Sequence, residues 1–220
     1  MKLDGFRDLH DRLLAAHGPQ DWWPGDTPFE IMVGAVLTQN TAWTNVEKAI
    51  ARLIDAHSLD AATILALAPE ALAELIRPAG YFNVKARRLQ SFCRFYLEAG
   101  GLETLARIPT DLLRPQLLAV HGIGPETADD ILLYALHRPV FVVDAYTRRI
   151  GERVGLLRGG EGYDQIRLRV ETELGPDAAL FNELHALIVI HDKNLCRKKP
   201  DCAACCLRAD CRSGLVRDAG

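Results

Sequence analysis

The chain has 220 residues, of which 49% are hydrophobic and 25% charged, the balance of a globular protein that buries a substantial core in one large or two small domains. Its formal net charge of −3 excludes an indiscriminate polyanion binder but is compatible with a local basic face. No apolar run reaches the length of a membrane span and the N-terminus has no signal-peptide core, so we expect a cytoplasmic protein.

Helical periodicity dominates the first hundred residues. Thr27 can cap a helix whose first residue is Pro28, and Glu30 occupies the capping-box position. Asn83 is predicted to cap a later helix. No convincing strand pattern of alternating apolar and polar residues appears, so the predicted fold class is all-α. Helices are expected near residues 6–16, 61–67 and 69–77. Leu37, Leu53 and Tyr96 are also expected to lie in helices.

Residues 115–139 predict a helix-hairpin-helix. Pro115 is expected to begin the first helix, because proline is costly in a helix interior. The Gly-Ile-Gly turn at 122–124 then opens into a second helix at Pro125. Glycine permits positive φ and a close approach of phosphate, and the free N–H groups of the helix start form an anion site. Such a module holds a nucleic-acid backbone through amides without reading sequence.

A short apolar run follows the hairpin and ends on an acidic residue. Val140 to Val143 precede Asp144, which stands directly before another helical pattern. Aspartate at this point is a favourable N-cap, and backbone N–H groups that bind a carboxylate keep it ionised at neutral pH.

Five of the six cysteines fall between residues 196 and 211. In a cytosolic chain such clustering indicates metal or redox chemistry more than disulfides. Four thiolates suit an iron–sulfur cluster, but structural zinc also accepts four cysteines. Cys206 is an extra thiol beside the C-x5-C-x2-C-x5-C pattern formed by Cys196, Cys202, Cys205 and Cys211.

The segments VHGIGPETAD at 120–129 and VVDAY at 142–146 resemble the helix-hairpin-helix DNA glycosylases of the endonuclease III superfamily, over most of the chain. The resemblance implies a two-domain fold, with a six-helix domain at 25–135, a second domain from 1–24 and 136–220, and an active cleft between them. It also implies a [4Fe–4S] cluster on the four cysteines, although the family usually has six residues in the first gap, and a monovalent cation at the hairpin.

The resemblance implies that Asp144 is the catalytic carboxylate. As the base leaves, the sugar gains positive charge, which a fixed carboxylate stabilises, and the same group can activate water. Family members that also cut the strand carry a lysine at the position of Glu126, and a carboxylate cannot form their Schiff base. We therefore expect a monofunctional glycosylase with little lyase activity. Glu126 either complements the helix dipole or takes part in the site, by touching the flipped base or sharing a proton with Asp144.

The implied partner is double-stranded DNA that contains a damaged or mismatched base, bound by a monomer at the nucleoid. Gln39 and Asn40 occupy a loop that enters the DNA in the resembling family, and lysines of the cysteine loop would face phosphates. The residues expected to contact DNA are Gln39, Asn40, His121, Gly122, Ile123, Gly124, Glu126, Thr127, Lys198 and Lys199.

Three functions remain open at this point. The hairpin sequence looks most like the enzymes that excise alkylated purines such as 3-methyladenine. Excision of oxidised pyrimidines or mismatched bases is the first alternative. A non-catalytic binder of DNA structures is the second, although such a binder has no need of a carboxylate at Asp144.

Overall fold

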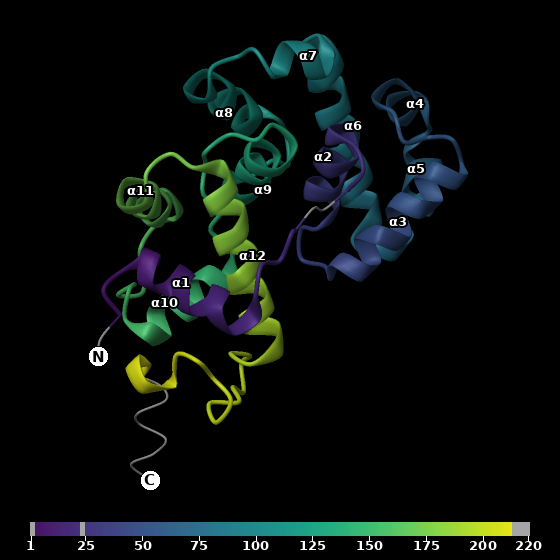
Figure 1. Cartoon of the computed structure of the whole chain (residues 1–220). Helices are drawn as coiled ribbons and strands as arrows, with labels where there is room; N and C mark the ends of the chain where they lie inside the picture. Colours follow the sequence, from purple (N-terminus) through teal and green to yellow (C-terminus); the bar gives the residue numbers. More distant parts are fainter. Residues whose placement is uncertain (1–2, 23–24, 213–220) are drawn as a thin grey trace. The chain divides into compact units, whose positions relative to one another are not determined.

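The computed structural model describes residues 3–22 and 25–212. The chain forms two compact units (Figure 1): unit 1 comprises Met1–Trp22 and Pro139–Gly220, and unit 2 comprises Trp23–Arg138. The described residues form helices joined by turns and extended segments, without a β-strand, so the prediction of an all-α fold is confirmed. Within these residues, no helix has the length and apolar character of a transmembrane span.

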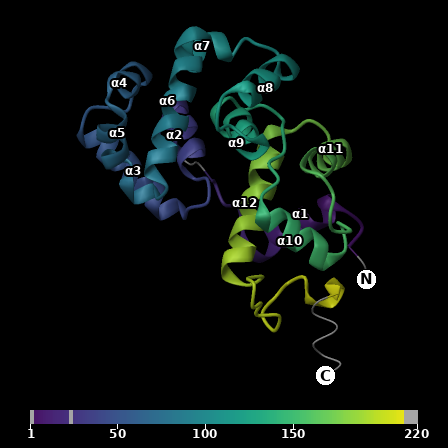
Figure 2. The same cartoon turned by 180° about the vertical axis from the view of Figure 1, so that it is seen from behind.

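Unit 2 is built around one buried helix, α2 (Pro28–Leu37), in which every residue from Ile31 to Leu37 is buried. It packs against α3, α6, α9 and η2 (Figures 1 and 2). The other elements of this unit are α3 (Trp43–Asp55), α4 (Ala61–Ala66), α5 (Pro69–Leu75), the 3₁₀ helix η1 (Arg77–Ala79), α6 (Phe82–Glu98), α7 (Gly101–Leu105), α8 (Thr110–Ala119), α9 (Pro125–Asp130) and the π-helix η2 (Ile131–Ala135).

Side-chain caps start two of these helices, and the cap at Thr27 confirms the prediction. The Thr27 hydroxyl accepts a hydrogen bond from the Glu30 N–H at 3.1 Å, and the Asp60 carboxylate accepts one from the Thr63 N–H at 2.9 Å. The predicted cap at Asn83 is wrong. Helix α6 already begins at Phe82, because the residue before it, Tyr81, turns the chain with φ of 46°.

The prediction that Pro115 begins the first hairpin helix is also wrong. Helix α8 begins at Thr110, directly after Pro109, and continues through Pro115. An interior proline costs a helix about 3 kcal/mol. Tertiary contacts offset this cost, because Leu113 and Leu117 are completely buried and the intervening Arg114 forms an ion pair with α9.

A buried lysine ties two turns of unit 2 together. The Lys85 side chain is 1% exposed, and its Nζ donates to the carbonyl oxygens of Leu37 at 2.8 Å and Ala79 at 2.7 Å. These carbonyls end α2 and η1. Burial, with the neighbouring charge of Arg88, lowers the pKa of Lys85 to about 8.

Replacing Lys85 with methionine should destabilise the protein by about 2–5 kcal/mol, because two buried carbonyl groups lose their donor. The free energy of unfolding of the wild type should also rise with pH between about 8 and 10.4, where the unfolded chain binds more protons than the folded one. Urea unfolding measures both effects. Lys48→Met, at an exposed position on α3, is the matched control, and equal stability of the two variants would contradict the prediction.

Unit 1 is arranged around α12 (Ala178–Asn194), which packs against α1 (Phe6–His17) and α10 (Ala145–Val154), as Figure 2 shows. Helix α11 (Tyr163–Leu174) and the 3₁₀ helix η3 (Arg208–Asp210) complete it. The apolar run before α10 has no regular secondary structure and is buried from Val140 to Val143. Side chains accept from two of its backbone N–H groups: Phe141 N–H donates to the Glu171 carboxylate at 2.9 Å, and Val143 N–H to the Tyr163 hydroxyl at 3.3 Å.

Candidate active site, hairpin and cysteine loop

Asp144 is the N-cap of α10. Its Oδ1 accepts a hydrogen bond from the Thr147 N–H at 2.7 Å, which satisfies one free donor of the helix start. Its Oδ2 lies 3.6 Å from Nε2 of His185 on α12. Both side chains are largely buried, with 8% of Asp144 and 7% of His185 exposed. The carboxylate is therefore held at one point by α10 and α12 together.

The surroundings of Asp144 favour its ionised form. Burial alone raises the pKa of a carboxyl group, but the proximity of His185 and the hydrogen bond from the Thr147 N–H outweigh burial here. The pKa of Asp144 consequently lies below its ordinary value. At neutral pH the group is a carboxylate, which can stabilise positive charge or accept a proton from water.

Two arginines further along α10 fix this helix in unit 1. Arg149 donates to both oxygens of Asp192 on α12, at 2.7 and 2.5 Å, and Asp192 is 2% exposed. One turn later, Nη1 of Arg153 donates to the carbonyl oxygens of Cys196 at 2.6 Å and Arg197 at 2.8 Å. The helix that Asp144 caps therefore binds the cysteine loop near its C-terminal end.

The predicted hairpin lies in unit 2 between α8 and α9. Gly122 has φ of 87°, which favours glycine, and a Cβ at this residue would come within 2.2 Å of the Arg88 side chain. Ile123 is buried, whereas His121 and Gly124 are exposed. The two hairpin helices are joined by a bidentate ion pair, in which Arg114 donates to the fully buried Asp129 at 2.7 and 3.0 Å.

The Gln39 side chain is bonded to the hairpin. Its Nε2 donates to the carbonyl oxygen of Gly122 at 3.0 Å and to the Thr127 hydroxyl at 2.9 Å, while Arg88 donates to its Oε1. The structure therefore brings together three predicted site residues: Gln39, Gly122 and the buried Thr127. The next residue, Asn40, is exposed and has φ of 55°.

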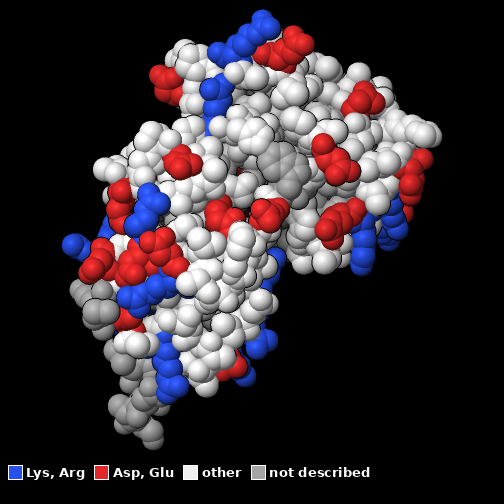
Figure 3. All heavy atoms as spheres, in the orientation of Figure 1, with Lys and Arg blue, Asp and Glu red and all other residues white. Residues whose placement is uncertain are grey.

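Other predicted contact residues are exposed on their own units. Glu126 is an exposed first-turn residue of α9. Lys198 and Lys199 are exposed on the loop after α12. Tyr81, which the sequence did not single out as a contact residue, exposes 73% of its surface at the start of α6. On the face shown in Figure 3, acidic and basic side chains are interspersed over both units, which agrees with the small net charge.

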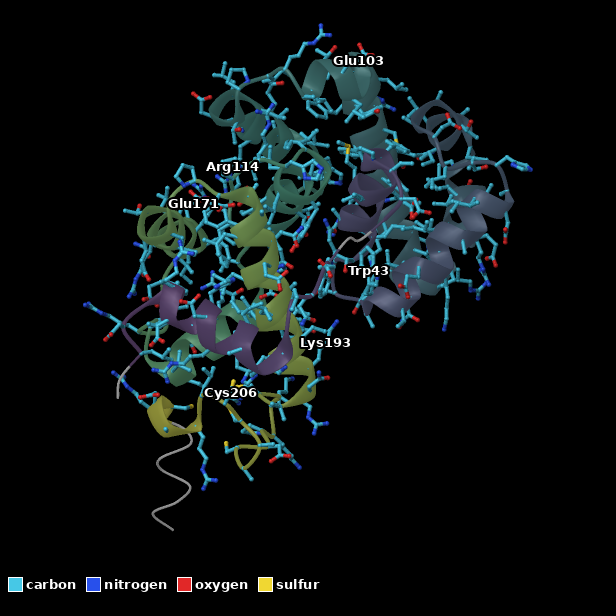
Figure 4. All side chains as sticks on the ribbon, in the orientation of Figure 1. Trp43, Glu103, Arg114, Glu171, Lys193 and Cys206 are labelled. Atoms are coloured by element: carbon cyan, nitrogen blue, oxygen red, sulfur yellow. The ribbon has the colours of Figure 1, made fainter. Side chains whose placement is uncertain are left out.

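The four cysteines of the predicted pattern line one cavity, together with Arg153, Leu195, Pro200, Asp201 and Arg208. Arg153 also donates to the Cys196 sulfur at 3.2 Å. The extra thiol, Cys206, is exposed and is not among the lining residues. Figure 4 shows Cys206 on the loop that follows α12. Four cysteines around one cavity, with a cationic donor to one sulfur, match the donor set of an iron–sulfur cluster.

Replacing Cys206 with serine should leave the iron content unchanged, because this thiol does not line the cavity. Cys205→Ser is the matched change one residue earlier, and we expect it to lose iron because it removes one of the four cysteines that line the cavity. Iron and sulfide analysis of the purified variants measures the difference. Loss of iron from the Cys206 variant alone would reverse the assignment of these two thiols.

His185 and Arg153, like Tyr81, are residues that the sequence did not indicate as part of a site. His185 stands in a continuous buried stretch of α12, a position that is typical of a packing residue. Arg153 is one of several arginines on α10. Both act through residues more than 40 positions away along the chain, Asp144 and Cys196, and no local sequence signal reports such contacts.

A hairpin of this form, joined to a helical unit with a capped aspartate and a four-cysteine loop, defines the class of helix-hairpin-helix DNA repair proteins. Residues 33–176 match the family model described as HhH-GPD superfamily base excision DNA repair protein. The chain is 45% identical over 215 residues to a Methanocaldococcus jannaschii protein provisionally named DNA repair glycosylase, covering 96% of this chain and 98% of that protein. The chain therefore belongs to the HhH-GPD superfamily and is a DNA glycosylase of base excision repair.

Two solved structures are similar in fold. An endonuclease III–DNA complex superposes with a TM-score of 0.83 at 22% identity, covering 97% of both chains. The Helicobacter pylori 3-methyladenine DNA glycosylase bound to 1,N6-ethenoadenine has a TM-score of 0.73 at 31% identity, covering 87% of this chain and 98% of that one. The first likeness concerns the fold alone, whereas the second extends to sequence.

Proposed function

We propose that this glycosylase is monofunctional and hydrolyses the N-glycosidic bond of an alkylated purine such as 3-methyladenine, leaving an abasic site in double-stranded DNA. The observation that carries this proposal is Asp144, an ionised, buried carboxylate fixed by Thr147 and His185. The similarity in sequence to the 3-methyladenine enzyme supports the choice of substrate.

In the proposed reaction Asp144 acts on the sugar and its attacking water. The carboxylate stabilises the positive charge that the sugar gains as the base leaves. It also orients a water molecule, or accepts its proton, as that water attacks the sugar carbon. His185 acts through Asp144, because its Nε2 approaches the carboxylate oxygen that Thr147 does not bind. His185 is thus a positioning residue.

The hairpin is proposed to bind the DNA backbone through its main-chain amides. Gln39 stabilises the hairpin by donating hydrogen bonds to Gly122 and Thr127.

The exposed Asn40 and Tyr81 are proposed to enter the duplex, since an exposed aromatic side chain can stack on an unpaired base. Lys198 and Lys199 would neutralise phosphates of the DNA backbone. The resemblance to the family also implies a monovalent cation at the hairpin.

The proposed cofactor is a [4Fe–4S] cluster on Cys196, Cys202, Cys205 and Cys211, which line one cavity. When bound, such a cluster supplies a redox-active centre and cross-links the loop. The purified protein should then contain iron and sulfide and absorb visible light. Zinc without iron would replace this assignment by a structural zinc site.

Incubation with sodium borohydride should trap no covalent enzyme–DNA adduct. Glu126 is a carboxylate where the strand-cutting relatives carry a lysine, so no amine is available there to form a Schiff base. Denaturing gel electrophoresis after reaction on a lesion-bearing duplex provides the measurement. The variant Glu126→Lys is the informative companion, because a trapped adduct in that variant alone would place residue 126 at the sugar. A trapped adduct in the wild type would refute the monofunctional assignment.

A screen of lesion-bearing duplexes tests the proposed substrate. The duplexes contain 3-methyladenine, 1,N6-ethenoadenine, thymine glycol, uracil or a thymine mismatch, and strand cleavage is compared with and without hot alkali. We expect release of the alkylated purine, with breaks that depend on alkali. Preferred release of thymine glycol or thymine would instead assign an endonuclease III-like or mismatch activity. Binding without release of any base would leave a non-catalytic DNA binder.

A further inference from the structure

Two histidines of unit 1 form a chain of contacts that ends on a cysteine of the cavity. Nε2 of His17, the last residue of α1, lies 2.9 Å from Nδ1 of His191 on α12. The other ring nitrogen of His191, Nε2, lies 3.4 Å from the Cys205 sulfur. His191 is completely buried. None of the steps assigned above to base excision uses these two rings.

The chemistry of a cluster ligand fixes the direction of these hydrogen bonds. A cysteine bound to iron is a thiolate, which carries no proton and only accepts. His191 must then carry its proton on Nε2, and in a neutral ring Nδ1 becomes the acceptor. His17 Nε2–H is the donor that faces this acceptor at 2.9 Å. Both contacts are thereby satisfied by a single tautomer of each ring.

We infer that His191 donates an N–H···S hydrogen bond to Cys205 of the cluster, and that His17 holds His191 in the required tautomer. This inference rests on the proposed [4Fe–4S] cofactor. Hydrogen bonds to the sulfurs are among the factors that set the reduction potential of such clusters, and an outer partner that orients a ligand-contacting histidine is a common feature of metal sites. The two histidines therefore tune the cluster, with His17 acting only through His191.

The midpoint potential of the cluster, measured in the purified full-length protein, tests this assignment. A hydrogen bond to sulfur stabilises the additional negative charge of the reduced cluster, so His191→Leu should lower the potential. We expect at least a tenfold change in the reduction equilibrium, which is about 59 mV for one electron. His191→Asn retains an N–H donor and should recover part of the difference. His10→Asn, at a largely buried histidine of α1 that bonds Asp11, should leave the potential unchanged.

The role given to His17 has its own test. His17→Leu should lower the potential less than His191→Leu does, and adding it to His191→Leu should change nothing further. Equal and additive shifts of the two single variants would overturn the relay, because residues that act through one another are not additive. An unchanged potential in His191→Leu would overturn the whole inference.

The wild-type protein provides a measurement that does not depend on variants. With ¹⁵N-labelled histidine, pulsed EPR of the paramagnetic cluster should detect a hyperfine coupling to one histidine nitrogen, transmitted through the N–H···S bond. A missing coupling would overturn the relay even if the variants fail to fold. Zinc bound in addition to iron would also overturn it. His17, His191 and Cys206 offer ligand atoms within 4.8 Å of one another, and histidines that bind zinc there would not form the proposed relay. A protein without iron would refute the cofactor itself, before any potential is measured.

Discussion

Replacing Asp144 with asparagine is expected to lower the single-turnover rate of base release by about 10³-fold or more, equivalent to about 4 kcal/mol of transition-state stabilisation. Asparagine is an equally good helix N-cap, so α10 should keep its start and the fold should survive. What disappears is the negative charge that faces the cationic sugar. Because DNA binding is proposed to depend on the hairpin, the dissociation constant for an undamaged duplex should stay within about twofold.

The matched control for this variant is Asp177→Asn. Asp177 is also an N-cap, accepting a hydrogen bond from the Leu180 N–H at 3.0 Å at the start of α12, but it is exposed. The control should retain wild-type activity, since it makes the same chemical change at another helix start. Unimpaired base release by the Asp144 variant would refute the catalytic role, and equal losses in both variants would point to a general effect on helix capping.

The largest effect on stability is expected from Arg114→Met. Arg114 pairs with Asp129, a carboxylate with no exposed surface, through two hydrogen bonds of 2.7 and 3.0 Å. Removing the arginine takes away the charged partner that donates two hydrogen bonds to this buried carboxylate, and breaking a buried ion pair costs about 3–5 kcal/mol. Because this pair joins α8 to α9, the two helices that flank the Gly-Ile-Gly turn, affinity for DNA should fall as well.

Urea unfolding of Arg114→Met against Arg107→Met provides the test. Arg107 contributes an exposed ion pair to Glu103, with 82% of its side chain exposed, so its loss should cost about 1 kcal/mol at most. The double variant Arg114→Met, Asp129→Leu removes both charges and should recover much of the lost stability. Equal stability of the two arginine variants would show that the buried pair contributes nothing measurable.

Features that depend on neighbours in the chain were predictable from the sequence. Thr27 caps a helix because its side-chain oxygen reaches a backbone N–H three residues later. The positive φ of Gly122 and the cap at Asp144 follow from the same local chemistry. The cysteines lie close enough in the chain for their common cavity to be expected.

Features that depend on distant residues were not predictable in this way. The position of Pro115 inside α8 reflects the packing of Leu113 and Leu117, which outweighs the intrinsic cost of proline. The start of α6 at Phe82 depends on the left-handed conformation of Tyr81, which local propensity disfavours. His185 could be placed beside Asp144 only once the fold was known, since α10 and α12 meet through tertiary packing.

The pH dependence of base release by the wild type tests the central role of Asp144 most directly. The pKa of this carboxyl group lies below its ordinary value, because His185 and the Thr147 N–H outweigh burial, so the group is ionised throughout the range from pH 8 to pH 5. The single-turnover rate on the preferred substrate should therefore show no loss from protonation of Asp144 between pH 8 and pH 5. A tenfold fall for each pH unit already between pH 7 and pH 5, abolished in Asp144→Asn, would reveal a carboxyl group with a raised pKa and contradict the proposed mechanism.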